Sequence, residues 1–103
     1  MSNYMNGKVI IITGAGGGFG RLVSQKTAAL GACVVASDVN EAELTITADS
    51  VTALGGRIEA VLADVTDQEQ MIGLAERAVA CFGAIDVMVN NAGVMPLAFY
   101  ADH

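Results

Sequence analysis

Basic residues, proline and histidine are scarce in this sequence of 103 residues. Five lysines and arginines stand against eleven aspartates and glutamates, and the resulting net charge of −6 disfavours nucleic acid or an anionic membrane as a partner. A single proline in a chain that is 53% hydrophobic argues against disorder. The one histidine, His103, has no neighbouring group in the sequence that suggests catalysis. The chain is therefore expected to be an acidic, packed globular protein.

Long apolar runs and cysteines are also few. No run approaches the roughly 20 apolar residues that a membrane-spanning helix needs. Residues 1–8 have neither the basic start nor the apolar core of a secretory signal. The two cysteines, Cys33 and Cys81, lie in segments that favour reduced core thiols over a disulfide. These features predict at most one domain over residues 1–103, in a cytoplasmic protein.

Glycine, by contrast, is concentrated in one loop that contains Gly14, Gly16, Gly17, Gly18 and Gly20. An apolar run over 8–13 precedes the loop and predicts a strand buried on both faces. A helical pattern follows and ends at Gly31, and its predicted buried stripe is Phe19, Leu22, Val23, Lys26, Ala29 and Leu30. Glycine allows a tight turn and lets another group approach the backbone, while a helix N-terminus attracts phosphate. The segment therefore predicts a phosphate-binding strand, loop and helix.

The rest of the chain repeats the alternation of strand and helix. Further strands are predicted over 32–37, 57–63 and 85–89. Two capping boxes are predicted to start the intervening helices, Asn40 with Glu43 and Thr66 with Glu69. The predicted buried stripes of these helices are Leu44, Ala48, Val51 and Leu54, then Met71, Leu74, Ala75, Ala78 and Phe82. Such alternation indicates an α/β fold, a doubly wound parallel sheet in strand order 3-2-1-4 with helices on both faces.

Polar residues follow each predicted strand, where parallel sheets bind ligands. Asp38 ends the second strand, 18 residues after Gly20, near the interval expected for a carboxylate that holds an adenosine ribose. Asp64 follows the third strand, and residues 90–93 (Asn-Asn-Ala-Gly) follow the fourth. Each group could serve only as a turn, because Asp, Asn and Gly are common turn residues. Their coincidence at four strand ends instead favours a nucleotide site.

The glycine spacing fits neither G-x-G-x-x-G, whose last position holds Phe19, nor a P-loop. It fits T-G-x-x-x-G-x-G over 13–20. Together with Asp64-Val65 and the Asn-Asn-Ala-Gly run, in that order, this pattern resembles the short-chain dehydrogenase/reductase family over 8–93. The resemblance implies that 1–103 is part of a single Rossmann-type, dinucleotide-binding domain, with a truncated three-layer α/β/α architecture.

The resemblance also implies roles for individual residues. Gly14 would make the turn, the backbone near Gly18 and Phe19 would hold the pyrophosphate, and Gly20 would allow close helix packing. Asp38 would hold the adenosine ribose, and Asn90 would tie strands together. Asp64 and Val65 would contact adenine. The implied cofactor-binding residues are Gly14, Gly16, Gly17, Gly18, Phe19, Gly20, Asp38, Val39, Asp64, Val65, Asn91, Ala92 and Gly93. Phe19 replaces the family's usual Ile or Leu.

NAD is the expected cofactor, because Asp38 would repel the 2′-phosphate of NADP and no cation stands at Ala15, Val39 or Asn40. The family's catalytic Ser, Tyr-x-x-x-Lys pair and Asn would lie beyond residue 103. Tyr100 is no substitute, since it follows the fourth strand too closely. We therefore assign no catalytic or metal-binding residue and expect the 103 residues alone to be inactive. The full-length parent is expected to be a homo-oligomer that transfers hydride between NAD and an alcohol or ketone.

Two alternatives stay open at this point. One is a dinucleotide-binding module without catalysis. The other is an S-adenosylmethionine methyltransferase, which also has glycines after its first strand and acidic residues after the next two. The spacing from Gly14 to Gly18 and the Asn-Asn-Ala-Gly run count against the methyltransferase. A Tyr-x-x-x-Lys pair further along the polypeptide would distinguish an enzyme from a binding module.

Overall fold

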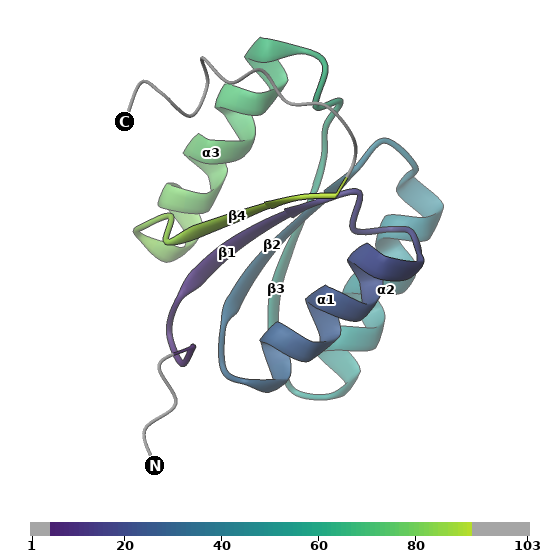
Figure 1. Ribbon diagram of the computed structural model, residues 1–103, viewed down its shortest axis with the longest axis vertical. Coiled ribbons are helices and arrows are strands. Elements are labelled where there is room, and N and C mark those ends of the chain that lie inside the picture. The colour runs from purple at the N-terminus through teal and green to yellow at the C-terminus, as the bar shows by residue number, and fades with distance from the viewer. Residues whose placement is uncertain (1–4, 92–103) are drawn as a thin grey trace.

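The computed structural model describes residues 5–91 of the chain. Strands and helices alternate along these residues, and Figure 1 traces them from the purple N-terminal strand to the yellow-green last one. The elements are β1 (Val9–Thr13), α1 (Gly18–Ala29), β2 (Cys33–Asp38), α2 (Glu41–Ala53), β3 (Arg57–Leu62), α3 (Gln68–Phe82) and β4 (Val87–Asn90).

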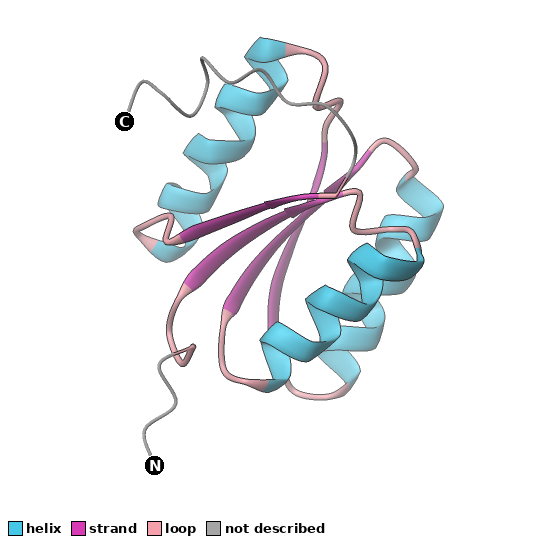
Figure 2. Ribbon diagram, viewed as in Figure 1, coloured by secondary structure: helices cyan, strands magenta, loops and turns pink. Residues whose placement is uncertain are grey.

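The four strands form one parallel sheet in the order β3-β2-β1-β4, as the sequence predicts. Helices α1 and α2 lie against one face of the sheet, and α3 lies against the other (Figures 1 and 2). The central pair is in register from Val9 opposite Cys33 to Thr13 opposite Ser37. This arrangement brings the carboxyl ends of all four strands to one edge of the sheet.

The core lies on the two faces of β1 and β2. Every residue of β1 is buried, which agrees with its unbroken apolar sequence. Side chains alternate between the faces, so Ile11 points toward α3 while Ile10 and Ile12 point toward α1 and α2. Met71 and Leu74 of α3 complete the first cluster. The glycine loop thus leaves a strand that is fixed on both sides.

The predicted buried stripe of α1 is mostly wrong, although Val23 packs against the core at partial burial. Phe19 is 63% exposed, and Leu22 and Leu30 are also exposed. The buried residues are instead small, and they repeat at four-residue spacing: Gly20, Ser24 and Ala28. Small side chains let the helix axis approach the sheet, and the hydroxyl of Ser24 is satisfied by the carbonyl of Gly20 at 2.8 Å. Close approach of α1 therefore takes precedence over burial of its larger apolar residues.

The stripes of the other two helices are closer to prediction. In α2 the buried residues are Leu44, Thr47 and Val51, whereas Leu54 is 78% exposed because it lies beyond the last helical turn. In α3 the predicted Met71, Leu74 and Ala78 are all buried.

The helix caps differ from the predicted capping boxes. The side chain of Asn40 accepts a hydrogen bond from the N–H of Glu43, as expected, but the N–H of Asn40 donates to Asp38 rather than to Glu43. The cap of α3 is Asp67, not Thr66, because the carboxylate of Asp67 accepts from the two N–H groups of Glu69 and Gln70. Only half of the first box is formed. The second box is not formed, because the cap is one residue later than predicted and the N–H of Asp67 donates to the carbonyl of Asp64.

Strand β4 begins two residues later than predicted. Asp86, just before it, forms hydrogen bonds with Val9, the first residue of β1. The carboxylate of Asp86 accepts from the N–H of Val9 at 2.8 Å, and the N–H of Asp86 donates to the carbonyl of Val9.

Cys33 is buried as predicted, but Cys81 is exposed, so the prediction that both thiols are in the core is half wrong. Within residues 5–91, no helix is long and apolar enough to span a membrane.

Candidate functional site

The carboxyl ends of β1, β2 and β3 border a pocket of about 310 Å³. Its walls come from the glycine loop, from the end of β2 and from the segment after β3. The lining residues are Gly14, Asp38, Val39, Ala63, Asp64, Val65 and Thr66. Five of these seven belong to the predicted cofactor-binding set: Gly14, Asp38, Val39, Asp64 and Val65. The fold thus brings side chains from three strand ends to one cavity.

The glycine loop turns sharply at Gly14, whose φ of +65° lies in the left-handed region that glycine favours. Helix α1 begins at Gly18, within the glycine run, so its first turn is formed by Gly18, Phe19 and Gly20. The residue before the helix, Gly17, provides no side-chain cap. The N–H groups of that first turn are left to an external acceptor, which suits a phosphate.

The glycines of the loop fall into two groups. A Cβ on Gly20 would lie 2.1 Å from the carbonyl oxygen of Gly14, and a Cβ on Gly16 would lie 2.9 Å from Asp38 Oδ2. Neighbouring protein atoms therefore leave no room for a side chain at these two positions. A Cβ on Gly18 would meet nothing within 4 Å, and one on Gly17 would meet only the Gly14 carbonyl at 3.9 Å. Packing inside the described chain explains the glycines at 16 and 20, but not those at 17 and 18.

The carboxylate of Asp38 is half-buried at the inner wall of the pocket. Its Oδ2 accepts a hydrogen bond from the N–H of Gly16 at 2.8 Å, and its Oδ1 accepts from the N–H of Asn40 at 3.0 Å. The side chain is therefore held in one orientation. Each carboxylate oxygen retains a further lone pair, so Asp38 can still accept hydrogen bonds from a ligand. Next to it, Val39 is 67% exposed.

The side chain of Asp64, which follows β3, forms hydrogen bonds within its own loop. Its Oδ1 accepts from both the hydroxyl and the N–H of Thr66, at 2.7 and 2.9 Å. These two hydrogen bonds stabilise the charged form and lower the pKa of Asp64 below its ordinary value, with the hydroxyl making the larger contribution. The side chain of the adjacent Val65 is buried under α3. Only the backbone of Val65 is then available to a ligand.

The end of the fourth strand, β4, is joined to Thr13 and to the glycine loop by hydrogen bonds. The Thr13 hydroxyl lies 3.1 Å from Asn90 Oδ1 and accepts from the N–H of Asn91 at 3.0 Å. Asn91 also donates through Nδ2 to the carbonyl of Gly14 at 3.3 Å. Asn90 thus joins β4 to β1, in keeping with its predicted role. Ala92 and Gly93 lie outside the described residues.

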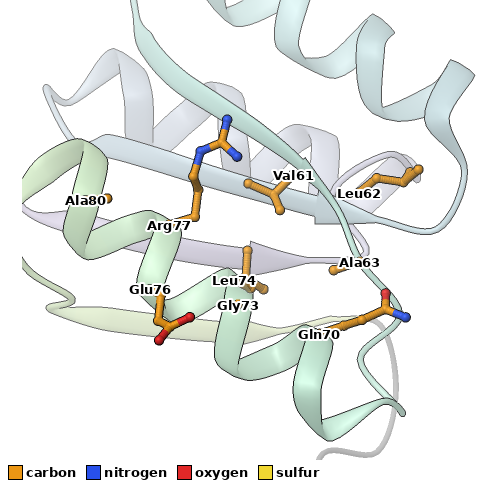
Figure 3. A pocket seen from close by; sticks show the side chains of 9 residues that line it. All are labelled: Val61, Leu62, Ala63, Gln70, Gly73, Leu74, Glu76, Arg77 and Ala80. Atoms are coloured by element: carbon orange, nitrogen blue, oxygen red, sulfur yellow. The ribbon is translucent and has the colours of Figure 1, made fainter.

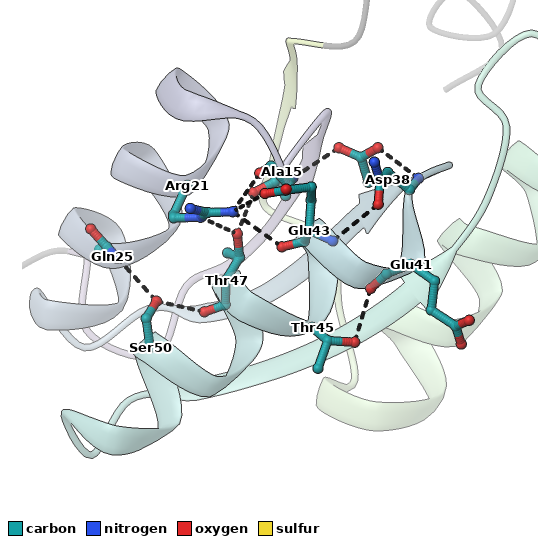
Figure 4. A network of polar contacts seen from close by, with 11 residues as sticks. Ala15, Arg21, Gln25, Asp38, Glu41, Glu43, Thr45, Thr47 and Ser50 are labelled. Atoms are coloured by element: carbon teal, nitrogen blue, oxygen red, sulfur yellow. Dashed lines mark hydrogen bonds and ion pairs between the residues drawn. The ribbon is translucent and has the colours of Figure 1, made fainter.

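Two further polar residues contact the loop and were not predicted from the sequence. Arg21 of α1 and the buried Thr47 of α2 donate hydrogen bonds to the carbonyls of Gly16 and Ala15, each at 2.8 Å (Figure 4). A threonine inside an otherwise apolar helical stripe was the available signal for Thr47, because a buried hydroxyl needs a partner. Nothing in the sequence pattern distinguishes Arg21 from a surface arginine.

A larger groove of about 470 Å³ lies between β3 and α3 (Figure 3). Its walls are mainly the alkyl parts of side chains such as Val61 and Leu74. Two of its three polar side chains are already engaged, since Arg77 pairs with Glu59 and Gln70 accepts from the N–H of Asp64, and the third is Glu76. This groove offers no chemistry comparable to the pocket at the strand ends. Within residues 5–91, no three His, Cys, Asp or Glu side chains could together hold a metal ion.

Comparison with known families matches residues 8–103 of the chain to the model described as short chain dehydrogenase. Among curated proteins, the cyclohexanol dehydrogenase of Acinetobacter sp. (strain SE19) is 41% identical over 95 residues. The matched region covers 92% of this chain and 38% of that relative. The chain thus spans less than two-fifths of the length of this relative.

Solved structures agree with this match. A short chain dehydrogenase/reductase from Burkholderia phymatum, in complex with NAD, is 40% identical with a TM-score of 0.80, over 85% of this chain and 31% of that one. A metagenomic short-chain oxidoreductase in complex with NADP is 33% identical with a TM-score of 0.83, over 90% of this chain and 42% of that one. The two relatives share the fold but were solved with different nicotinamide cofactors.

Proposed function

This chain belongs to the short-chain dehydrogenase family and forms its nicotinamide-nucleotide-binding portion, and we propose that the glycine loop and the four strand ends hold NAD. In this proposal the first turn of α1 binds the pyrophosphate through backbone N–H groups. The methyltransferase alternative is set aside by the family membership, whereas a binding module without catalysis stays open.

The open space at Gly18 is the observation that carries the proposal. Protein packing explains the glycine at position 20 but not the one at 18, where a Cβ would meet nothing within 4 Å. Glycine in a helix costs about 0.5–1 kcal/mol relative to alanine. A ligand that must approach the backbone at Gly18 accounts for this cost, and the uncapped helix end makes that ligand anionic.

The adenosine half of the cofactor fits the pocket of about 310 Å³. Asp38 would accept hydrogen bonds from the ribose hydroxyls through the lone pairs that Gly16 and Asn40 leave free. Asp64 and the backbone of Val65 would contact the adenine edge. Asn91, with Ala92 and Gly93 after it, would line the far side of the ribose.

The preference for NAD over NADP rests on the charge at the ribose site. The Asp38 carboxylate would repel a 2′-phosphate, while the exposed Val39 and the capping Asn40 bring no cation. Arg21 is the cation bound to the loop, and it is paired with Glu43 at 2.7 Å. Because the relatives include both an NAD and an NADP complex, family membership alone does not decide the cofactor.

For the whole protein we propose hydride transfer between NAD and an alcohol or ketone. The catalytic residues are expected in the part of the family that this chain does not match, since the chain covers 38% of its cyclohexanol dehydrogenase relative. We accordingly propose that residues 1–103 belong to a single dinucleotide-binding domain and are inactive alone. A cytoplasmic homo-oligomer without nucleic-acid or membrane partners remains our expectation for the full protein.

Calorimetric titration of the protein with NAD, NADP and S-adenosylmethionine tests the proposed site. Binding of NAD, about tenfold to a hundredfold tighter than NADP, is expected, because a charge-assisted hydrogen bond is worth about 1.5–3 kcal/mol. Equal affinity for the two nicotinamide cofactors would contradict the role of Asp38. No binding of either would contradict the site itself. Oxidation of an alcohol by the full-length protein would separate the enzyme from the binding module.

A further inference from the structure

We propose that Arg21 and Thr47 are positioning residues: they hold two successive peptide groups of the glycine loop, and so fix the backbone that leads into the first turn of α1, where the pyrophosphate would bind. This inference rests on the proposed function, since it assigns a role within the same site. Both side chains reach the loop from the side of α1 and α2, as Figure 4 shows. They bind loop carbonyls, so they act on the backbone that would hold the cofactor.

The peptide group between Ala15 and Gly16 is held at both ends. Its carbonyl accepts the Thr47 hydroxyl at 2.8 Å, and its N–H donates to Asp38 Oδ2 at 2.8 Å. The oxygen and hydrogen of a trans peptide point in opposite directions. Two partners on opposite sides therefore prevent this peptide from rotating about the chain. Thr47 is fully buried, which keeps water from competing for the carbonyl.

The next peptide group, between Gly16 and Gly17, is held in the same way. Its carbonyl accepts from Arg21 Nη2 at 2.8 Å, and the Gly17 N–H points to the carbonyl of Gly14 at 3.4 Å. The short bond to Arg21 is the stronger restraint of the two. The carbonyl of Gly17 then accepts from the N–H of Arg21 at 2.7 Å, which starts α1.

The guanidinium of Arg21 is itself fixed by α2. Its Nε donates to the Thr47 hydroxyl at 2.9 Å, and its Nη2 lies 2.7 Å from Glu43 Oε2. A planar guanidinium can make these bonds together, whereas the single ammonium of a lysine cannot reproduce their geometry. Thr47 joins the two restraints, because it accepts from Arg21 and donates to Ala15.

The loop needs such external restraint because its own glycines provide little beyond the long hydrogen bond from Gly17 to Gly14. Glycine has no side chain to pack and more backbone freedom than any other residue. A loop that is ordered before the ligand arrives avoids the entropy cost of ordering during binding. Arg21 and Thr47 therefore increase cofactor affinity without touching the cofactor.

Titration of NAD against four variants of the protein tests this role. Thr47→Val removes the hydroxyl but keeps the side chain's shape, and Thr47→Ser keeps the hydroxyl but removes the methyl group. Arg21→Lys keeps the charge but loses the planar fork. The matched control is Ser50→Ala, in the same α1–α2 contact but away from the loop. It breaks the hydrogen bonds of Ser50 with Gln25 at 3.0 Å and with the backbone carbonyl of Thr47 at 2.7 Å, and it leaves the Thr47 hydroxyl in place.

Thr47→Val and Arg21→Lys are expected to weaken NAD binding about tenfold, the loss that follows from one hydrogen bond to a charged group. Thr47→Ser should bind NAD nearly as well as the unaltered protein, although the lost methyl group lowers its melting temperature. Ser50→Ala should leave binding unchanged. In the ligand-free protein, the amide resonances of Gly16 and Gly17 should broaden or shift in Thr47→Val but not in Ser50→Ala.

The outcomes separate the inference from the proposed function. Unchanged NAD affinity in Thr47→Val and Arg21→Lys overturns the positioning role while the site stands. Affinity that follows melting temperature across all four variants also overturns it, because the effect is then general destabilisation. Failure of the unaltered protein to bind NAD overturns the proposed function, and the inference with it.

Discussion

Gly20 and Gly14 are packed so closely that a Cβ on Gly20 would lie 2.1 Å from the Gly14 carbonyl oxygen. The contact brings the first turn of α1 against the turn that follows β1. Gly18, two residues earlier, has open space at the equivalent position. Packing within the protein thus requires glycine at position 20, whereas at position 18 only a bound ligand would require it.

Gly18→Val is expected to abolish NAD binding while the fold is largely kept, because its side chain would occupy only the space assigned to the pyrophosphate. Gly20→Ala should instead destabilise the protein by at least about 1–3 kcal/mol, the usual cost of overpacking. Thermal unfolding and NAD titration of both variants check this division. A Gly18→Val protein that binds NAD within a few-fold of the parent would show that the loop is wrongly assigned.

Asp38→Asn is expected to reduce the preference for NAD over NADP. The amide oxygen of asparagine can still accept from the N–H of Gly16, which keeps the contact to the glycine loop. The hydrogen bond from the N–H of Asn40 is lost, because the amide NH2 group cannot accept it. The negative charge that repels the 2′-phosphate is lost, and the ratio of the two affinities should fall about tenfold or more. Parallel titrations with the two cofactors measure this ratio. A ratio unchanged by the substitution would remove Asp38 from cofactor selection.

Thr13→Val is expected to destabilise the protein by about 0.5–1.5 kcal/mol, the usual net contribution of a hydrogen bond to stability. The hydroxyl of Thr13 joins β1 to Asn90 and Asn91, and valine keeps its shape without its oxygen. Thr13→Ser is the control, since it restores the hydroxyl. Denaturant unfolding compares the three proteins, and equal midpoints for Val and Ser would disprove the link.

Asp64 is expected to titrate below the ordinary aspartate value of about 3.9, because Thr66 stabilises its charged form. A carboxyl whose folded pKa is lowered adds stability above its unfolded pKa, and this stability is lost as the pH falls through the folded value. The effect therefore lies below about pH 4. Thr66→Val should raise the pKa of Asp64 and Thr66→Ser should not, as carbon NMR of the carboxyl group can measure.

The 103-residue chain alone is expected to self-associate and to turn over no alcohol with NAD. Within residues 5–91 no strand pairs with the outer edge of β4, and Val87 on that strand is 43% exposed. Open apolar edges invite pairing between chains. Val87→Lys should reduce the association seen in sedimentation velocity. A monomeric, cooperatively melting chain that oxidises an alcohol would contradict both expectations.

The sheet was predictable because its signals are local and repeated. The alternation of strand and helix predicts a parallel sheet, the dinucleotide-binding pattern favours the order that is found, and the apolar run of β1 matches its complete burial. The face of α1 was not predictable in this way. Periodicity assigns large apolar residues to the core, whereas the close contact between Gly20 and Gly14 turns Phe19 outward.

The site was predictable where a strand end fixes a residue's place, as for Asp38 and Asp64. The contacts of Arg21 and Thr47 with the loop join residues on different elements. The place of Thr47 in an apolar stripe shows only that its hydroxyl needs a partner, and the sequence pattern does not distinguish Arg21 from a surface arginine. The cap of α3 was missed for a smaller reason. Thr66 and Asp67 both suit a cap, and the hydroxyl of Thr66 is engaged by Asp64.

The pairing of β4 with β1 sets an order of events during synthesis. Asp86 and Val9 are 77 residues apart in the chain, while β2 and β3 join the sheet next to their immediate predecessors. Contacts across a long separation form late, because the intervening chain must first be ordered. We expect the first three strands to assemble while β4 is still in the ribosome. Asn91 would then reach the carbonyl of Gly14 after the other contacts of the site, and the nascent chain would complete its cofactor site only at that step.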